Sequence, residues 1–169
     1  LLFWNGDGTN LPAKMAVEYL RGLCQGDGLA KGTFPVFGDP VHLSGIKIPV
    51  CAIACETDHI AAWKGSFNGV KQFGSKDKTF VLSQSGHIAG IVNPPSKNKY
   101  GHYTNDGPMT TPEEWQAGAT FHPGSWWPRW GEWLASRSGK QIPARVPGDS
   151  TNPVLAPAPG TYVVAKPSA

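Results

Sequence analysis

The chain has 169 residues, of which 40% are hydrophobic, and this length suits one domain with a real core better than two. It holds 21 glycines and 16 prolines, while only 16% of its residues are charged; the average is about 25% charged. This composition excludes a coiled coil, a long helical bundle and a highly charged disordered chain. The net charge is only +3 and the basic run Lys97-Asn98-Lys99 is short, so no nucleic-acid partner is expected.

The first predicted element is an amphipathic helix from Leu11 to about Cys24. Asn10 can cap this helix, and Pro12 lies in its first turn, where proline is well tolerated. The apolar residues that recur at helical spacing are Met15, Tyr19, Leu20 and Leu23. Gly26 and the glycines after it end the helix and lead into a loop.

Two apolar segments of strand length follow. Residues 48–55 (IPVCAIAC) and 78–83 (KTFVLS) are the nearly continuous apolar runs expected where both faces of a parallel sheet are covered. Between them, residues 61–73 have the length and partial periodicity of a crossover helix, although two glycines weaken the pattern. The sequence therefore predicts a strand–helix–strand unit.

A long loop, two short helices and a tail are predicted for the rest of the chain. Residues 93–111 are polar, and the capping box from Thr111 to Glu114 predicts a helix that continues to about Phe121. Ser125 can cap the second helix, which extends to Gly139. After residue 140 the Pro-rich and Ala-rich chain is expected to be extended and weakly ordered.

The second of these helices is rich in tryptophan. One stripe of it carries Trp126, Trp130 and Trp133. An aromatic stripe can bind an apolar surface such as a lipid or polymer, but packing on a core is the more common use and is the favoured interpretation. Trp127, beside the stripe, is expected to be the most exposed of the four.

Each predicted strand ends in a residue that can titrate. Asp58 follows the first strand and His87 follows the second. If the strands are parallel neighbours, about 5 Å apart, the loops that leave them meet at one edge of the sheet, where open parallel sheets bind ligands. This order of acid and histidine fits the last two members of a nucleophile–acid–base triad of the α/β-hydrolase type.

These two side chains have definite chemical uses. A histidine can take a proton from a thiol or hydroxyl, and a carboxylate on its second nitrogen fixes the tautomer. Gly86 and Gly90 would let the histidine loop approach a substrate. The alternatives are that Asp58 or Thr57 caps the following helix and that His87 is an ordinary loop histidine. His59 could position substrate or simply lie at the surface.

The three cysteines offer two further candidate sites. Cys24 lies in a Gly-x-Cys-x-Gly pattern, but a nucleophile elbow needs a buried strand before it and a helix after it, whereas a helix precedes Cys24 and a loop follows. Cys51, Cys55 and His59 would form a zinc face on a helix, but Pro49 and the apolar run favour a strand with buried structural thiols. No metal site is expected, and reduced thiols favour a reducing compartment.

Several stretches of the chain resemble the poly(3-hydroxyalkanoate) synthases, most closely the short-chain class I enzymes. They are residues 3–12 (FWNGDGTNLP), 58–60 (DHI), 85–95 (SGHIAGIVNPP), 97–99 (KNK), 124–128 (GSWWP) and 157–163 (PAPGTYV). The resemblance implies an α/β fold: the C-terminal part of an α/β-hydrolase-type domain, with part of a cap subdomain. Residues 1–44 would be cap-derived and lead back to the sheet, residues 45–139 would belong to the catalytic domain, and residues 140–169 would be the tail.

The resemblance also implies a reaction and its participants. These enzymes polymerise (R)-3-hydroxyacyl-CoA on a cysteine and release CoA, without a further cofactor. His87 would be the general base and Asp58 would orient it, or also help activate the incoming hydroxyl. In this family the nucleophilic cysteine lies well before the segment that the chain resembles. The chain is therefore expected to be a C-terminal portion that lacks the nucleophile and is inactive alone. Cys24 matches no catalytic position of the family.

The partners follow from the same resemblance. A substrate contact is expected from position instead: Asn93, Lys97 and Lys99 lie just past the histidine loop, so one of them is expected to contact CoA phosphate. The growing polyester, the surface of the polymer granule in the cytoplasm and a second copy in a homodimer are the expected partners. Two rival functions stay open: a thioesterase or polyester hydrolase, and a non-enzymatic module that binds granule or lipid surfaces.

Overall fold

A computed structural model describes residues 8, 10–161 and 165. These residues divide into two compact units, one formed by residues 14–138 and the other by the described residues before and after that range. Two of the segments that resemble the synthases, 3–12 and 157–163, lie partly outside the described residues. Residues 140–161 contain no helix or strand. In the described part of the chain, no helix combines the length and the apolar character that crossing a membrane requires.

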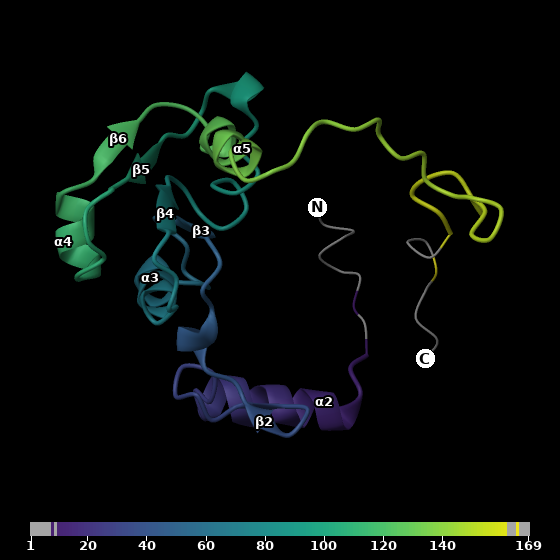
Figure 1. The fold of residues 1–169 in the computed structure, drawn as a ribbon, viewed down its shortest axis with the longest axis horizontal. Helices are drawn as coiled ribbons and strands as arrows, with labels where there is room; N and C mark the ends of the chain where they lie inside the picture. Colours follow the sequence, from purple (N-terminus) through teal and green to yellow (C-terminus); the bar gives the residue numbers. More distant parts are fainter. Residues whose placement is uncertain (1–7, 9, 162–164, 166–169) are drawn as a thin grey trace. The chain divides into compact units, whose positions relative to one another are not determined.

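A four-stranded sheet is the centre of the larger unit (Figure 1). Its strands β3 (Val50–Cys55), β4 (Lys78–Ser83), β5 (His102–Thr104) and β6 (Thr120–His122) lie in that order. The first two are parallel, in the register that pairs Val50 with Lys78 and Cys55 with Ser83, and the other pairs are antiparallel. The prediction of an α/β fold with two parallel apolar strands is confirmed.

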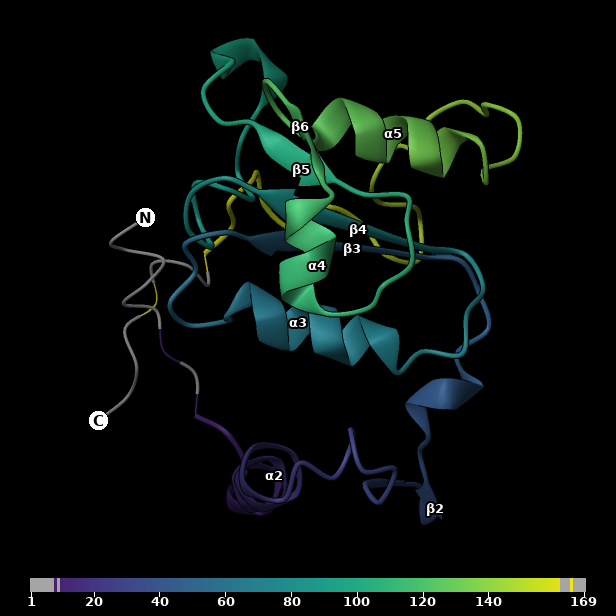
Figure 2. The same cartoon turned by 90° about the vertical axis from the view of Figure 1, so that its left-hand side faces the viewer.

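Helix α3 (Trp63–Lys71) connects the parallel strands and covers one face of the sheet (Figure 2). Helix α4 (Pro112–Ala117) packs beside it, and α5 (Trp127–Ala135) lies on the opposite face. The core between the sheet, α3 and α4 consists mainly of aromatic and aliphatic side chains: Ala54, Trp63, Phe67, Val70, Phe80, Leu82 and Trp115. The crossover helix is thus confirmed, with the sequence alternation of β4 directing Phe80 and Leu82 toward it.

The N-terminal part of this unit is helical and then forms a small hairpin. Helix α2 (Ala13–Glu18) continues directly into a π-helix, η1 (Tyr19–Gln25), so the predicted helix is confirmed with a wider second half. Strands β1 (Pro35–Val36) and β2 (Asp39–Pro40) form a hairpin that the sequence pattern does not predict. Its two turn residues have positive φ, and glycine at the second makes the turn possible. The 3₁₀ turn η2 (Leu43–Gly45) follows.

Two sequence predictions in the C-terminal half are wrong in detail. The loop predicted over residues 93–111 contains a 3₁₀ turn, η3 (Pro95–Lys97), and strand β5. The capping box at Thr111 is confirmed, but α4 ends at Ala117 and the chain turns at Gly118 into β6. Strands of three residues are too short to show an alternation, and their ladders join segments far apart in the sequence.

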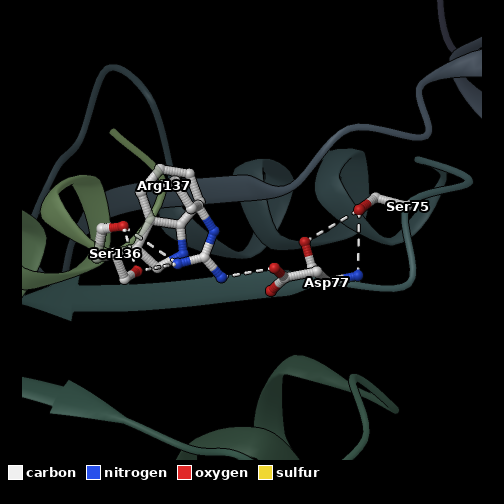
Figure 3. Close-up of polar contacts among 5 residues, drawn as sticks. Ser75, Asp77, Ser136 and Arg137 are labelled. Atoms are coloured by element: carbon white, nitrogen blue, oxygen red, sulfur yellow. Dashed lines mark hydrogen bonds and ion pairs between the residues drawn. The ribbon is translucent and has the colours of Figure 1, made fainter. Parts of the chain in front are cut away.

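An ion pair fastens the far end of α5 to the start of β4 (Figure 3). The Nη2 atom of Arg137 lies 2.5 Å from Oδ2 of Asp77, and its guanidinium stacks 4.3 Å from the centre of the Trp133 ring. The hydroxyl of Ser75 both accepts from the N–H of Asp77 and donates to its carbonyl, which orders the turn before the strand. The helix is therefore held at its C-terminal end by side chains rather than by a long buried face.

Candidate acid–base site

The candidate site lies at the carboxyl edge of the two parallel strands. Beyond the strand ends, the N–H of Glu56 donates to Ser83 O at 2.8 Å and that of Thr57 donates to Ser85 O at 3.1 Å. These bonds extend the pairing of β3 with β4 into the loops and hold the loops together. Asp58 Oδ1 and His87 Nδ1 consequently lie 3.4 Å apart. The structure thus brings together the two residues predicted as an acid–base pair.

The Asp58 carboxylate is fixed in place by the backbone. Only 6% of its side chain is exposed, and Oδ1 accepts hydrogen bonds from the N–H groups of Ile60 and Ala61, each at 2.9 Å. The Ala61 N–H lowers the pKa of Asp58 most, and that of Ile60 and the imidazoles of His87 and His59 lower it further. Asp58 therefore remains an anion at neutral pH. It caps the turn that follows it rather than helix α3, whose N-terminal residue has no side-chain cap.

His87 is open to solvent on the side away from the aspartate. Its side chain is 39% exposed, and the ring of His59 lies 5.9 Å away at 57°. With Nδ1 toward the carboxylate, Nε2 is the nitrogen left for a reacting group, as general-base catalysis by a histidine requires. A separation of 3.4 Å is long for a hydrogen bond, but catalytic pairs are often looser before substrate is present. The catalytic roles of both residues, and a substrate role for His59, remain predictions.

The loop that carries His87 has an unusual backbone. Ser85 has φ +73°, a left-handed conformation that a serine rarely adopts. The loop then makes a tight turn, in which the N–H of Gly90 donates to Gly86 O and that of Val92 donates to Ile88 O, both at 2.8 Å. A Cβ at position 90 would lie 2.7 Å from Cys55 Sγ, so glycine there serves close packing inside the protein.

Two tryptophans contact this loop from the start of α5. The indole N–H of Trp126 donates to Gly90 O at 2.8 Å, and that of Trp127 donates to Ile91 O at 2.9 Å. Sequence reasoning placed these residues on the helix but did not connect them with the histidine loop. The only signal was general, because a buried indole N–H needs an acceptor somewhere.

The tryptophan stripe itself is partly in the interior. Trp126 is buried and Trp133 is half-buried, as expected for core packing. Trp130 is 41% exposed, more than Trp127 at 36%. The prediction that Trp127 would be the most exposed is therefore wrong, because its indole reaches back to Ile91 while that of Trp130 has no such acceptor among the described contacts.

The residues proposed to contact CoA have different surroundings. Asn93 is buried, and its amide donates to Tyr100 O at 3.0 Å. Lys97 is exposed at the end of η3. Lys99 Nζ lies 5.1 Å from the centre of the Tyr100 ring, and hydrogen bonds with Lys99 and then Ser85 lower the pKa of Tyr100. A contact of any of the three with substrate stays a prediction.

None of the three cysteines has the setting of a nucleophile. Cys24 is exposed on the π-helix η1, not on a strand-to-helix turn. Cys51 and Cys55 lie in β3, as predicted, so they share no helical face with His59. Burial, with the Asp58 charge second, raises the pKa of Cys55 to about 11. Among the described residues, no three acidic, histidine or cysteine side chains gather closely enough to hold a metal ion.

Another histidine, His102, is buried in strand β5. It is 5% exposed, and its Nδ1–H donates to Gly124 O at 3.0 Å. Its Nε2 has no partner among the described residues, and the His122 ring stacks on it at 5.1 Å. Burial lowers the pKa of His102, so the neutral form is the one that the fold accommodates.

We expect this histidine to make the fold sensitive to acid. Its pKa is lowered in the folded state relative to the reference of about 6.5, so the unfolded chain binds the proton more tightly. Its stabilising contribution is complete above about pH 6.5 and is lost as the pH falls below it, by at most about 1.4 kcal/mol per pH unit. Urea unfolding between pH 8 and 5 measures this. His102→Gln should flatten the pH dependence, and the exposed-site control His42→Gln should not; equal slopes in all three proteins would contradict the expectation.

The chain is similar in sequence to known proteins of one family. No family model matches the chain. It is 46% identical over 164 residues to the poly(3-hydroxyalkanoate) polymerase of Methylorubrum extorquens, and 44% identical over 169 residues to the polymerase subunit PhaC of Cupriavidus necator. The subunit of Rhizobium meliloti is 43% identical over 163 residues. These matches cover 96% to 98% of this chain but only 26% to 28% of each relative. The chain is therefore homologous to a segment of the poly(3-hydroxyalkanoate) polymerases, the family that its motifs indicated.

Proposed function

We propose that this chain supplies the acid and the base of a poly(3-hydroxyalkanoate) polymerase. The reaction is acyl transfer: (R)-3-hydroxyacyl-CoA, with 3-hydroxybutyryl-CoA as the expected substrate, is polymerised and CoA is released. The observation that carries the proposal is the contact of Asp58 with His87 at the carboxyl edge of two parallel strands. Homology to proteins named as these polymerases supports it. The α/β-hydrolase-type topology is part of the proposal.

The pair can perform both proton transfers of such a reaction. Nε2 of His87 takes the proton of a cysteine thiol, whose reference pKa is about 8.5, and the thiolate attacks the thioester carbonyl. The bond from carbonyl carbon to CoA sulfur breaks, and the departing CoA sulfur receives the proton from His87. His87 then takes the proton of a 3-hydroxyl group, whose oxygen attacks the carbonyl carbon of the acyl-cysteine. The ester bond forms, the bond from that carbon to the cysteine sulfur breaks, and His87 returns the proton to the departing cysteine sulfur. Asp58 stabilises the imidazolium in each half-reaction.

The cysteine in this scheme comes from another part of the polymerase. Cys24 lies exposed on a helix, and the thiols of β3 are inside a strand, with Cys55 held protonated by burial. We accordingly expect the 169-residue chain to show no turnover alone. The relatives are about four times longer than the segment they share with it, which leaves room for a strand-borne Gly-x-Cys-x-Gly.

The whole enzyme is proposed to act in the cytoplasm with three partners: the surface of the polymer granule, the growing polyester and a second copy of itself. If surface binding were the only function, the fragment would bind polyester with Asp58 and His87 dispensable.

Product analysis of the longer protein tests the proposal. It is incubated with (R)-3-hydroxybutyryl-CoA, and CoA release and polymer mass are measured together. The expected result is polymer with CoA released in proportion. Free hydroxy acid without polymer would show a hydrolase instead. A Cys24→Ala variant should make polymer as the unchanged protein does. Loss of activity in that variant would show that Cys24 is the nucleophile.

A further inference from the structure

The turn that carries His87 depends on contacts with distant residues for its position. Between Gly86 and Val92, beyond the end of β4, the N–H groups of Gly90 and Val92 bond within the turn itself. The bond from Gly90 N–H to Gly86 O encloses His87, so a rotation of this turn would move the imidazole. Asp58, by contrast, is held by two backbone N–H groups on the other loop. The geometry of the pair therefore depends on what holds the turn.

Three side-chain donors hold it, on two successive carbonyls. Gly90 O accepts from the Ser83 hydroxyl and from the Trp126 indole, each at 2.8 Å and each in buried surroundings. Ile91 O accepts from the Trp127 indole at 2.9 Å. These carbonyls lie three and four residues after His87, on the same turn. Two adjacent tryptophans thus bind two adjacent carbonyls of the histidine loop, 36 residues away in the chain.

The tryptophans are themselves anchored. The N–H of Trp127 donates to Ser125 Oγ at 3.1 Å, and His102 binds the carbonyl of Gly124, which has φ +83°. An indole has two side-chain torsions and is held by packing, so an N–H on it is a rigid donor. The N-cap residue and the first residue of α5 therefore present their indoles to the histidine loop from a fixed base.

We infer that Trp126 and Trp127 are positioning residues for His87, which set the imidazole against Asp58 through their indole N–H groups. The inference rests on the proposed function for its catalytic meaning, but the positioning can be measured without catalysis. Trp127 is the better probe because the residue is 36% exposed and the loss of its indole leaves no large cavity. Trp130, on the same helix and 41% exposed, is its matched control: its ring lies 6.0 Å from that of Trp126, and phenylalanine keeps an aromatic ring in that place.

The first test uses the 169-residue chain and nitrogen chemical shifts of the His87 ring at pH 9. A carboxylate facing Nδ1 favours the tautomer with the proton on Nδ1, and the shifts report the proportion of the two tautomers. Trp127→Phe should move this proportion toward that of a free imidazole and speed hydrogen exchange of the Val92 amide. Trp130→Phe should change neither. If the Trp127→Phe protein is folded and its His87 ring keeps the wild-type proportion of the two tautomers, the inference is overturned.

A second variant separates the hydrogen bond from the packing of the ring. β-(3-Benzothienyl)alanine at position 127 keeps the shape of tryptophan but has sulfur in place of N–H, and it should reproduce the change seen with Trp127→Phe. A wild-type spectrum would assign the effect to packing and refute the role of the N–H group.

Kinetics of the longer polymerase give the catalytic readout. Trp127→Phe should lower kcat about tenfold with KM unchanged, because one hydrogen bond that orients a base is lost while substrate contacts remain. Trp130→Phe should leave kcat unchanged, and an equal kcat for the two variants would contradict the inference. If the longer protein made no polymer, the proposed function would fail while the tautomer measurement would still decide the positioning.

Discussion

Replacing His87 with glutamine in the longer polymerase should lower kcat/KM by about 10²- to 10⁴-fold, the usual contribution of a general acid–base. Glutamine fills a similar space but cannot accept and return a proton at neutral pH. CoA release from (R)-3-hydroxybutyryl-CoA under first-order conditions measures the loss. The circular dichroism spectrum should be unchanged, because His87 is partly exposed and contributes little to the core.

Asp58→Asn should give a loss of similar order, since the amide cannot stabilise an imidazolium. The double variant should be little worse than either single one, because the two residues act as a unit. His42→Gln, at an exposed histidine outside the site, is the control for histidine loss as such. Activity within twofold of the wild type in both the His87 and Asp58 variants would refute the acid–base assignment.

Trp115→Ala should produce the largest loss of stability in the chain, about 3–5 kcal/mol in the free energy of unfolding. Trp115 is 1% exposed, and its ring packs edge-on against Phe80 at 5.2 Å and near Phe67 at 5.7 Å between centroids. Alanine would leave a cavity in the middle of the only large apolar cluster described. Since domains are stable by about 5–15 kcal/mol, much of the protein would unfold under mild conditions.

Trp115→Phe should cost much less than Trp115→Ala. Its indole N–H is buried without a partner among the described residues, so phenylalanine removes an unsatisfied donor as well as volume, and the two effects oppose each other. Urea unfolding followed by circular dichroism measures both variants, with Trp130→Ala as the exposed control. If the alanine and phenylalanine variants lost equal stability, the cavity argument would be wrong.

The predictable part of the fold is the part with long local patterns. Strands β3 and β4 have six residues each with an apolar centre, and α3 has helical spacing, so their order and the parallel pairing follow from the sequence. The proximity of Asp58 and His87 follows in turn, because both stand at the carboxyl ends of neighbouring parallel strands.

The rest depends on contacts between distant segments. Strands β5 and β6 pair through only three residues each. A strand of three residues is too short to show an alternating pattern in the sequence. The bonds from Trp126 and Trp127 to the histidine loop join a side chain to a backbone carbonyl, which carries no residue-type signature. The exposure of Trp130 is likewise set by the place of α5 on the sheet, and the helical spacing of the tryptophans does not predict it.

Helix α5 is held in different ways at its two ends, and ionic strength distinguishes them. The pair of Arg137 with Asp77 is between charges that are both partly open to solvent, so salt screens it and its contribution is at most about 1 kcal/mol. The indole bonds at the other end are between uncharged groups, one of them buried. Concentrated salt therefore releases the C-terminal end of α5 first, and the end that touches the histidine loop is the salt-tolerant one.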